Sequence, residues 1–111
     1  MCLHFNRVDE ALRALADETR RRILSLVWHH ERSAGDIAKD FSISRPAVSQ
    51  HLGVLRASKL VTLRKVGTRC LYRANHAAIA RLRAELGAFW DDRLNALKDR
   101  LEAAERRRGR P

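Results

Sequence analysis

Residues 44–55 read SRPAVSQHLGVL, and this segment determines which fold the rest of the chain can form. Ser44 is a good helix N-cap, and Pro46 falls in the first turn, where a helix does not need its missing N–H donor. Apolar side chains spaced four and three apart share one face of this helix: Val48, Leu52 and Leu55. The opposite face is polar and basic and displays Arg45, Ala47, Ser49, Gln50 and Arg56.

A second, shorter helix is expected just before it. Ser33 can cap a helix whose inward face is Ala34, Ile37, Ala38 and Phe41. The pair Ser42-Ile43 leaves room only for a tight turn before Ser44. Two helices joined by a few residues, the second polar and basic on its outer face, are typical of a helix-turn-helix.

Two more helices are predicted upstream. The first covers about Val8 to Ala16. Asp17 caps the second, which carries an apolar stripe and runs to about His30. The members of that stripe are Ile23, Leu24, Leu26 and Val27.

A basic β-hairpin is predicted downstream of the helix-turn-helix. Residues 60–65 and 69–73 are rich in β-branched or aromatic side chains, and Gly67 between them can adopt the positive φ that a hairpin turn needs. Period-two alternation puts Cys70 and Tyr72 on one face, where Cys70 is expected to be a small buried hydrophobe. Three bases lie near the tip: Arg64, Lys65 and Arg69.

The last helix is predicted to run from His76, capped by Asn75, to about Glu105. It would be about 45 Å long, which is more than the core of so short a chain needs. Its apolar stripe therefore favours a homodimer over packing within one chain. The predicted interface residues are Leu12, Leu82, Leu86, Phe89, Trp90, Leu94 and Leu97. Residues 1–105 would then form a single domain, and residues 106–111 a disordered basic tail.

Charge points to a polyanionic partner. The chain of 111 residues carries a formal net charge of +10, and no acid lies between Phe41 and Ala84. That stretch holds nine bases: Arg45, Arg56, Lys59, Arg64, Lys65, Arg69, Arg73, Arg81 and Arg83. Such a block favours a nucleic-acid surface over an inert solvated face.

Composition and motifs exclude several classes of protein. No apolar run is long enough for a membrane span, the first residues lack the apolar core of a secretion signal, and Cys2 and Cys70 suggest no disulfide framework. A cytoplasmic protein is expected. No nucleophile elbow, phosphate loop or zinc-hydrolase spacing occurs, so an enzyme is not expected.

Duplex DNA is the expected ligand. Gln can pair bidentately with adenine and Arg with guanine, while the methyl group of Ala47 can meet a thymine methyl. We therefore assign Ser44, Arg45, Ala47, Ser49 and Gln50 to DNA. On the hairpin, backbone or minor-groove contacts are assigned to Arg64, Lys65, Thr68 and Arg69. The alternatives are an architectural DNA-binding or RNA-binding protein, and the basic last helix leaves membrane binding as a third, which its acids oppose.

No metal site or cofactor is expected. His29 and His30 point about 100° apart on a helix. Cys2 and His4 fall short of a tetrahedral set, and His51 is expected to be a structural hydrogen-bonding group. A redox role for Cys70 is the weaker alternative.

Two motifs resemble the ArsR-type winged-helix repressors. Residues 14–24, ALADETRRRIL, are similar to the opening motif of that family, and residues 44–55 are similar to its recognition helix. The matching segments around Gly67 and Leu71 resemble its wing. This resemblance implies a mainly α fold, a winged helix-turn-helix with a small β-hairpin wing and a long C-terminal dimerisation helix. It also implies a dimeric transcription regulator, usually a repressor.

The chain departs from the metal-sensing members of that family. Ser33 and Gly35 stand where those members have two cysteines, and no histidine follows His76. The resemblance is therefore nearer to the branch that does not sense metals. The expected partners are an inverted-repeat operator in duplex DNA and a second copy of the chain.

Overall fold

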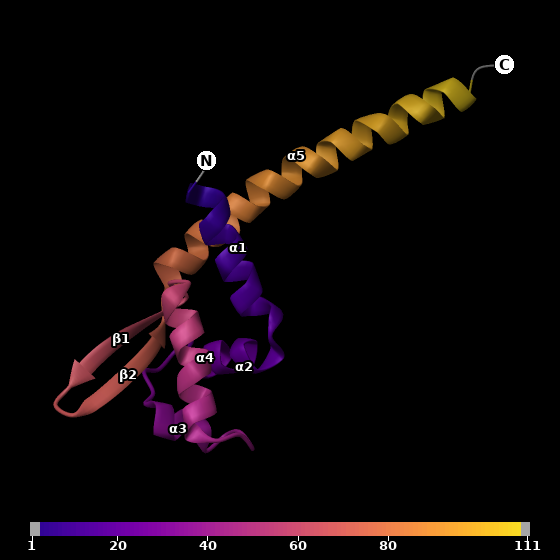
Figure 1. The fold of residues 1–111 in the computed structure, drawn as a ribbon. Helices are drawn as coiled ribbons and strands as arrows, with labels where there is room; N and C mark the ends of the chain where they lie inside the picture. The colour runs from indigo at the N-terminus through magenta and orange to yellow at the C-terminus, as the bar shows by residue number, and fades with distance from the viewer. Residues whose placement is uncertain (1–2, 110–111) are drawn as a thin grey trace. The chain divides into compact units, whose positions relative to one another are not determined.

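The computed structural model describes residues 3–109, and the side chains of residues 7–109. The elements follow in the order α1 (Leu3–Ala16), α2 (Glu18–Leu26), α3 (Ala34–Ala38), α4 (Arg45–Ala57), β1 (Val61–Val66), β2 (Arg69–Ala74) and α5 (His76–Arg108) (Figure 1). This order confirms the predicted fold class, a winged helix-turn-helix with a long C-terminal helix. By its internal contacts the chain divides into two units, Met1–Ala80 and Arg81–Pro111.

Helix α4 is the central element of the first unit. It packs against α1, α2, α3 and β1 (Figure 1). Its three predicted inward residues, Val48, Leu52 and Leu55, are fully buried. Each such side chain contributes about 1.5–3 kcal/mol when buried. One face of α4 is therefore fixed to the core, and the other is left free for a partner.

The junction of α1 and α2 is held by polar contacts from residues of the ALADETRRRIL motif. The Asp17 side chain accepts the backbone N–H of Arg20 at 3.0 Å, and this hydrogen bond lowers the pKa of that carboxyl. The Arg20 Nε donates to the Ala14 carbonyl at 2.7 Å, and the Arg21 guanidinium donates to the Leu15 carbonyl at 2.7 Å. The two arginines thus satisfy carbonyl groups that the end of α1 leaves unpaired.

Helix α2 ends before the predicted position near His30. The Val27 carbonyl accepts the N–H of Ala74 at 2.9 Å, and the Trp28 carbonyl lies 2.8 Å from Nε2 of His76. These carbonyls are bound by residues from β2 and the start of α5, so they are not available to continue the helix. The rings of Trp28 and His76 also meet edge to face, with centroids 4.6 Å apart.

The wing is an antiparallel hairpin whose register places Val66 opposite Arg69. Gly67 has a φ of +62°, as its place in the turn predicted. The sequence did not indicate a third segment, in which Arg32 exchanges both backbone hydrogen bonds with Tyr72, at 3.0 and 2.8 Å. The base of the wing is therefore anchored to the loop between α2 and α3.

Helix boundaries differ from the prediction at both ends of the chain. Helix α1 begins at Leu3 rather than near Val8, and no Gly or Pro interrupts the added turn. Helix α5 continues past Glu105 to Arg108, so three residues of the predicted disordered tail are helical. Arginine has a high helix propensity, and its charge is favourable against the dipole at a helix C-terminus.

The predicted caps of α3 and α5 are present. The Ser33 hydroxyl accepts the N–H of Asp36 at 3.2 Å, and the Asn75 side chain accepts that of Ala78 at 3.2 Å. Helix α3 is short, and Phe41, predicted on its inner face, follows the helix and is half-buried. Within residues 3–109, none of the helices combines the length and apolar character needed to cross a membrane.

Candidate nucleic-acid interface

The outer face of α4 is open to solvent. Arg45, Ser49 and Gln50 are exposed, and Ala47 is half-buried. The Ser44 hydroxyl accepts the N–H of Ala47 at 3.3 Å, so it acts as the helix cap. The predicted base-reading side chains thus lie on the face opposite the core.

A hollow of about 350 Å³ lies where α4, the start of α3 and the wing meet. It brings together four of the predicted DNA-binding residues, Arg45, Ser49, Thr68 and Arg69. Its remaining lining is Ser33, Ala34, Cys70 and Tyr72, which the sequence did not assign to DNA. The one sequence pattern that could have indicated a shared site was the period-two alternation, which placed Cys70 and Tyr72 on one face of the hairpin.

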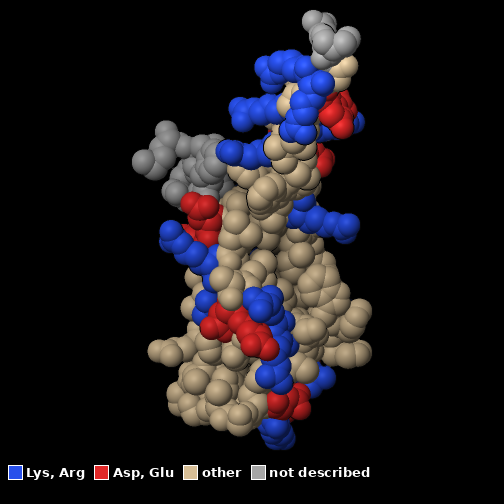
Figure 2. Space-filling view, turned by 90° about the vertical axis from the view of Figure 1, so that its right-hand side faces the viewer, with Lys and Arg blue, Asp and Glu red and all other residues tan. Residues whose placement is uncertain are grey.

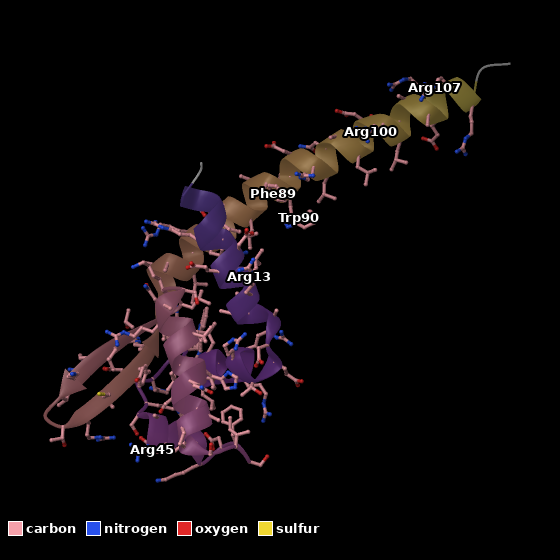
Figure 3. All side chains as sticks on the ribbon, viewed as in Figure 1. Arg13, Arg45, Phe89, Trp90, Arg100 and Arg107 are labelled. Atoms are coloured by element: carbon pink, nitrogen blue, oxygen red, sulfur yellow. The ribbon has the colours of Figure 1, made fainter. Side chains whose placement is uncertain are left out.

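Arg45 lies in this hollow, beside the start of α3 (Figure 3). A Cβ built on Gly35 would lie 3.8 Å from the Arg45 Cζ and 3.9 Å from the Ser33 hydroxyl. The guanidinium therefore runs along the first turn of α3.

Arg64 is held by a bidentate ion pair with Glu31. Its Nε and Nη2 donate to the two carboxylate oxygens at 2.9 and 2.8 Å. The hydrogen bond from Arg64 lowers the pKa of Glu31, and the same contact raises the pKa of Arg64. The structure thus places this predicted DNA ligand against an acid that the sequence did not connect with it.

Arg69 is also near an acid. Its Nη2 lies 3.6 Å from a carboxylate oxygen of Asp36, whose other oxygen lies 3.9 Å from the Lys39 ammonium. By contrast, Lys65 is exposed and has no ion pair among the described side chains. The wing bases thus differ in how freely they can meet DNA.

We expect Glu31→Gln to raise the affinity for random-sequence duplex DNA. The change releases Arg64 from its pair, and for an exposed ion pair of this kind the gain in affinity is at most about fivefold. Fluorescence anisotropy with a labelled duplex at fixed salt measures the effect. Glu10→Gln, at an exposed position on α1, is the charge-matched control. A lower affinity in Glu31→Gln would show that Glu31 orients Arg64 toward DNA instead.

Among the described side chains, the histidines and cysteines form no ligand cluster. Within the described part of the chain, no three His, Cys, Asp or Glu side chains gather where they could hold a metal ion. The His51 Nδ1 lies 3.4 Å from the Arg20 guanidinium, in agreement with a structural role. Cys70 was expected to be buried, but it is half-exposed because it lines the hollow. Cys2 and the side chain of His4 lie outside the described residues.

The predicted interface residues on α5 are largely exposed. Phe89, Trp90, Leu94 and Leu97 have exposed fractions between 38% and 56%, and Phe89 and Trp90 project from the helix (Figure 3). Leu82 and Leu86 are half-buried, and Leu12 on α1 is exposed. Figure 2 shows one face of the molecule, on which basic and acidic side chains lie next to each other.

A helix-turn-helix with an exposed polar and basic second helix, followed by a basic hairpin, defines a winged-helix DNA-binding protein. Comparison with known proteins identifies the family. The profile described as "Bacterial regulatory protein, arsR family" matches residues 17–62. The HTH-type transcriptional regulator Rv2034 of Mycobacterium tuberculosis is 46% identical over 82 residues, which cover 74% of this chain and 77% of that protein. The chain belongs to the ArsR family; it is a DNA-binding transcriptional regulator and not an enzyme.

Two further relatives agree. The transcriptional repressor SdpR of Bacillus subtilis is 35% identical over 61% of this chain and 76% of its own length. The solution NMR structure of a homodimeric winged helix-turn-helix DNA-binding domain from Mycobacterium bovis superposes with a TM-score of 0.65 at 32% identity. That match covers 83% of this chain and 85% of the other.

Proposed function

We propose that the protein is a homodimeric, sequence-specific repressor that binds an inverted-repeat operator in duplex DNA in the cytoplasm. The observation that carries this proposal is the division of α4 into a fully buried apolar face and an exposed polar face. The buried face fixes the helix on a rigid core, so the exposed face can enter a major groove as one body.

The exposed face has the chemistry for reading bases. Gln50 and Ser49 lie one turn into the helix, where Gln can accept and donate to adenine. The methyl group of Ala47 suits a thymine methyl. Ser44 and Arg45 lie at the start of the helix, next to where the DNA backbone would pass.

The wing extends the contact to the backbone or the minor groove. Lys65 and Thr68 are exposed near its tip, and Arg64 and Arg69 are exposed although each faces an acid. The anchoring of the wing through Arg32 and Tyr72 supports a fixed distance between these side chains and α4.

The dimer is supported by the exposed apolar stripe on α5 and by the homodimeric relative from Mycobacterium bovis. Large exposed apolar side chains along one helix indicate a surface that a partner covers. A second copy of the chain offers the same stripe. Two-fold symmetry of the protein would then match two half-sites in inverted orientation.

Selection from a library of random duplexes tests this function. We expect the enriched sequences to share an inverted repeat, and the protein to bind them at least 1000-fold more tightly than shuffled duplexes. Equal affinity for enriched and shuffled duplexes would indicate an architectural DNA-binding protein. Preference for a hairpin RNA would indicate an RNA-binding protein.

We expect operator binding to be independent of metal ions. The resemblance to the family places Ser33 and Gly35 where its metal-sensing members carry cysteines, and the Ser33 hydroxyl caps α3. Affinity for the enriched duplex, measured with zinc and with a chelator, should therefore change by less than about twofold. Release of the duplex by stoichiometric zinc would contradict this prediction.

A further inference from the structure

Two guanidinium groups from different elements face the hollow between α4 and the wing. Arg45 comes from the first turn of α4, and Arg69 comes from the start of β2. Three hydroxyl groups share the lining, those of Ser33, Ser49 and Thr68. No acid is among the lining residues, so the hollow presents cationic and neutral hydrogen-bonding groups to whatever enters it.

The charges around the hollow are not balanced within the protein. Arg69 has Asp36 at 3.6 Å, a separation too long for a strong charge-assisted hydrogen bond. Arg45 has no ion pair among the side chains of residues 7–109. The Arg69 guanidinium is therefore loosely paired and the Arg45 guanidinium is unpaired, so an anion can bind to both.

The position of the hollow fits one particular anion. The exposed face of α4 lies on one side and the wing on the other. When α4 enters a major groove and the wing follows the adjacent groove, the DNA backbone between the two grooves must pass between them. A phosphodiester presents two charged oxygens, which guanidinium groups bind in a planar, bidentate geometry.

We propose that this hollow, through Arg45 and Arg69, is the binding site for one backbone phosphodiester; we call it the phosphate site. Asp36 is its stand-in: in the free protein the carboxylate pairs loosely with Arg69 in place of the phosphate, and it is displaced when the phosphate binds. This proposal rests on the proposed function, since it places the phosphate beside the groove that α4 enters. It makes Arg45 a backbone-positioning residue, whereas the sequence alone suggested a guanine contact.

The salt dependence of binding tests whether the two arginines share one phosphate. With a random-sequence duplex, log K falls with log salt by about 0.9 for each phosphate that the protein neutralises. Arg45→Gln or Arg69→Gln alone should leave this slope close to that of wild type, because the remaining guanidinium still neutralises the shared phosphate. The double variant should lose about 0.9 per protomer. Arg13→Gln, at an exposed position on α1, is the control and should keep the wild-type slope.

Asp36→Asn tests the stand-in role. Removing the carboxylate frees Arg69, so we expect a two- to fivefold gain in affinity for random duplex. Asp40→Asn is the matched control, since it removes an equal charge close by. The Asp40 carboxylate pairs with Arg32 at 3.6 Å rather than with Arg69. A gain that is equal in both variants would reflect only long-range charge and would contradict the stand-in role.

Three results would contradict the proposal of a phosphate site. A slope loss of about 0.9 in each single variant would mean two separate phosphates, and an unchanged slope in the double variant would mean that DNA does not reach the hollow. A collapse of the preference for enriched over random duplex in Arg45→Gln would mean that Arg45 reads a base. The slopes are measured on random DNA, so they test the phosphate site even if no specific operator exists.

The identity of the phosphate can be tested directly. In the enriched duplex, one neutral methylphosphonate placed at the equivalent position of each half-site should weaken wild type about as much as the double arginine variant is already weakened. The same substitution should leave that double variant unaffected. If every methylphosphonate weakens the double variant as much as it weakens wild type, the hollow contains no phosphate site. Inorganic phosphate at millimolar concentration should compete no better than chloride at equal ionic strength, because a free anion lacks the contacts that the rest of the duplex makes with α4 and the wing.

Discussion

Replacing both Leu94 and Leu97 with glutamate should convert the proposed dimer into a monomer. Both side chains are more than half exposed in the single chain, so the change costs the protomer little. In the dimer each leucine would be buried in both protomers by symmetry, and each buried side chain contributes about 1.5–3 kcal/mol. The dimer should weaken by 4 kcal/mol or more, which is on the order of 1000-fold.

Sedimentation velocity at micromolar concentration measures the oligomeric state. Binding of the enriched duplex should fall on the same order, because one half-site offers too few contacts on its own. The control is Ala88→Glu with Asn95→Glu, at exposed positions that 100° per residue places on the opposite face of α5. An intact dimer in the leucine variant would place the interface outside this stripe.

The sequence predicted those parts of the fold that depend on local patterns. Val48, Leu52 and Leu55 are buried because their spacing dictates one helical face, and Gly67 turns the hairpin because it tolerates positive φ. Asp17, Ser33 and Asn75 cap helices because their side chains reach nearby N–H groups. Each of these features is set by residues within a few positions of one another.

Features set by distant residues could not be predicted in this way. Helix α2 stops early because Ala74 and His76, far along the chain, bind the carbonyls of Val27 and Trp28. One local feature was also missed: Lys59 adopts a φ of +63°, which is unusual for a residue with a Cβ. It does so where Leu60 bonds back to Leu55 at 2.9 Å and turns the chain into β1.

The candidate site shows the same division. The outer face of α4 and the basic wing follow from helical and strand periods. The acids that face the wing bases do not, because Glu31 and Asp36 lie outside the acid-free segment and meet Arg64 and Arg69 only in the folded chain. Counting charges along the sequence therefore overstates the number of wing bases free to meet DNA.

Replacing Gln50 with alanine should weaken binding of the enriched duplex by about 1–3 kcal/mol, or five- to 150-fold, for each bidentate contact that is lost. Binding of shuffled duplex should change little. Gln50 is exposed, and no hydrogen bond of its side chain is found within the described residues. The stability of the protein should therefore stay within about 0.5 kcal/mol of wild type. Titration of both duplexes at one salt concentration gives the two affinities.

Lys65→Ala supplies the comparison that makes the Gln50 result decisive. Lys65 contacts the backbone in the proposed complex, so its loss should weaken both duplexes about equally and reduce the salt slope. If Gln50 pairs with an adenine, replacing that adenine by 7-deazaadenine removes the N7 acceptor, and wild type should lose affinity while Gln50→Ala should not. Equal losses on enriched and shuffled duplexes in Gln50→Ala would mean that α4 lies on the backbone. The source of specificity would then have to be sequence-dependent DNA shape rather than base edges.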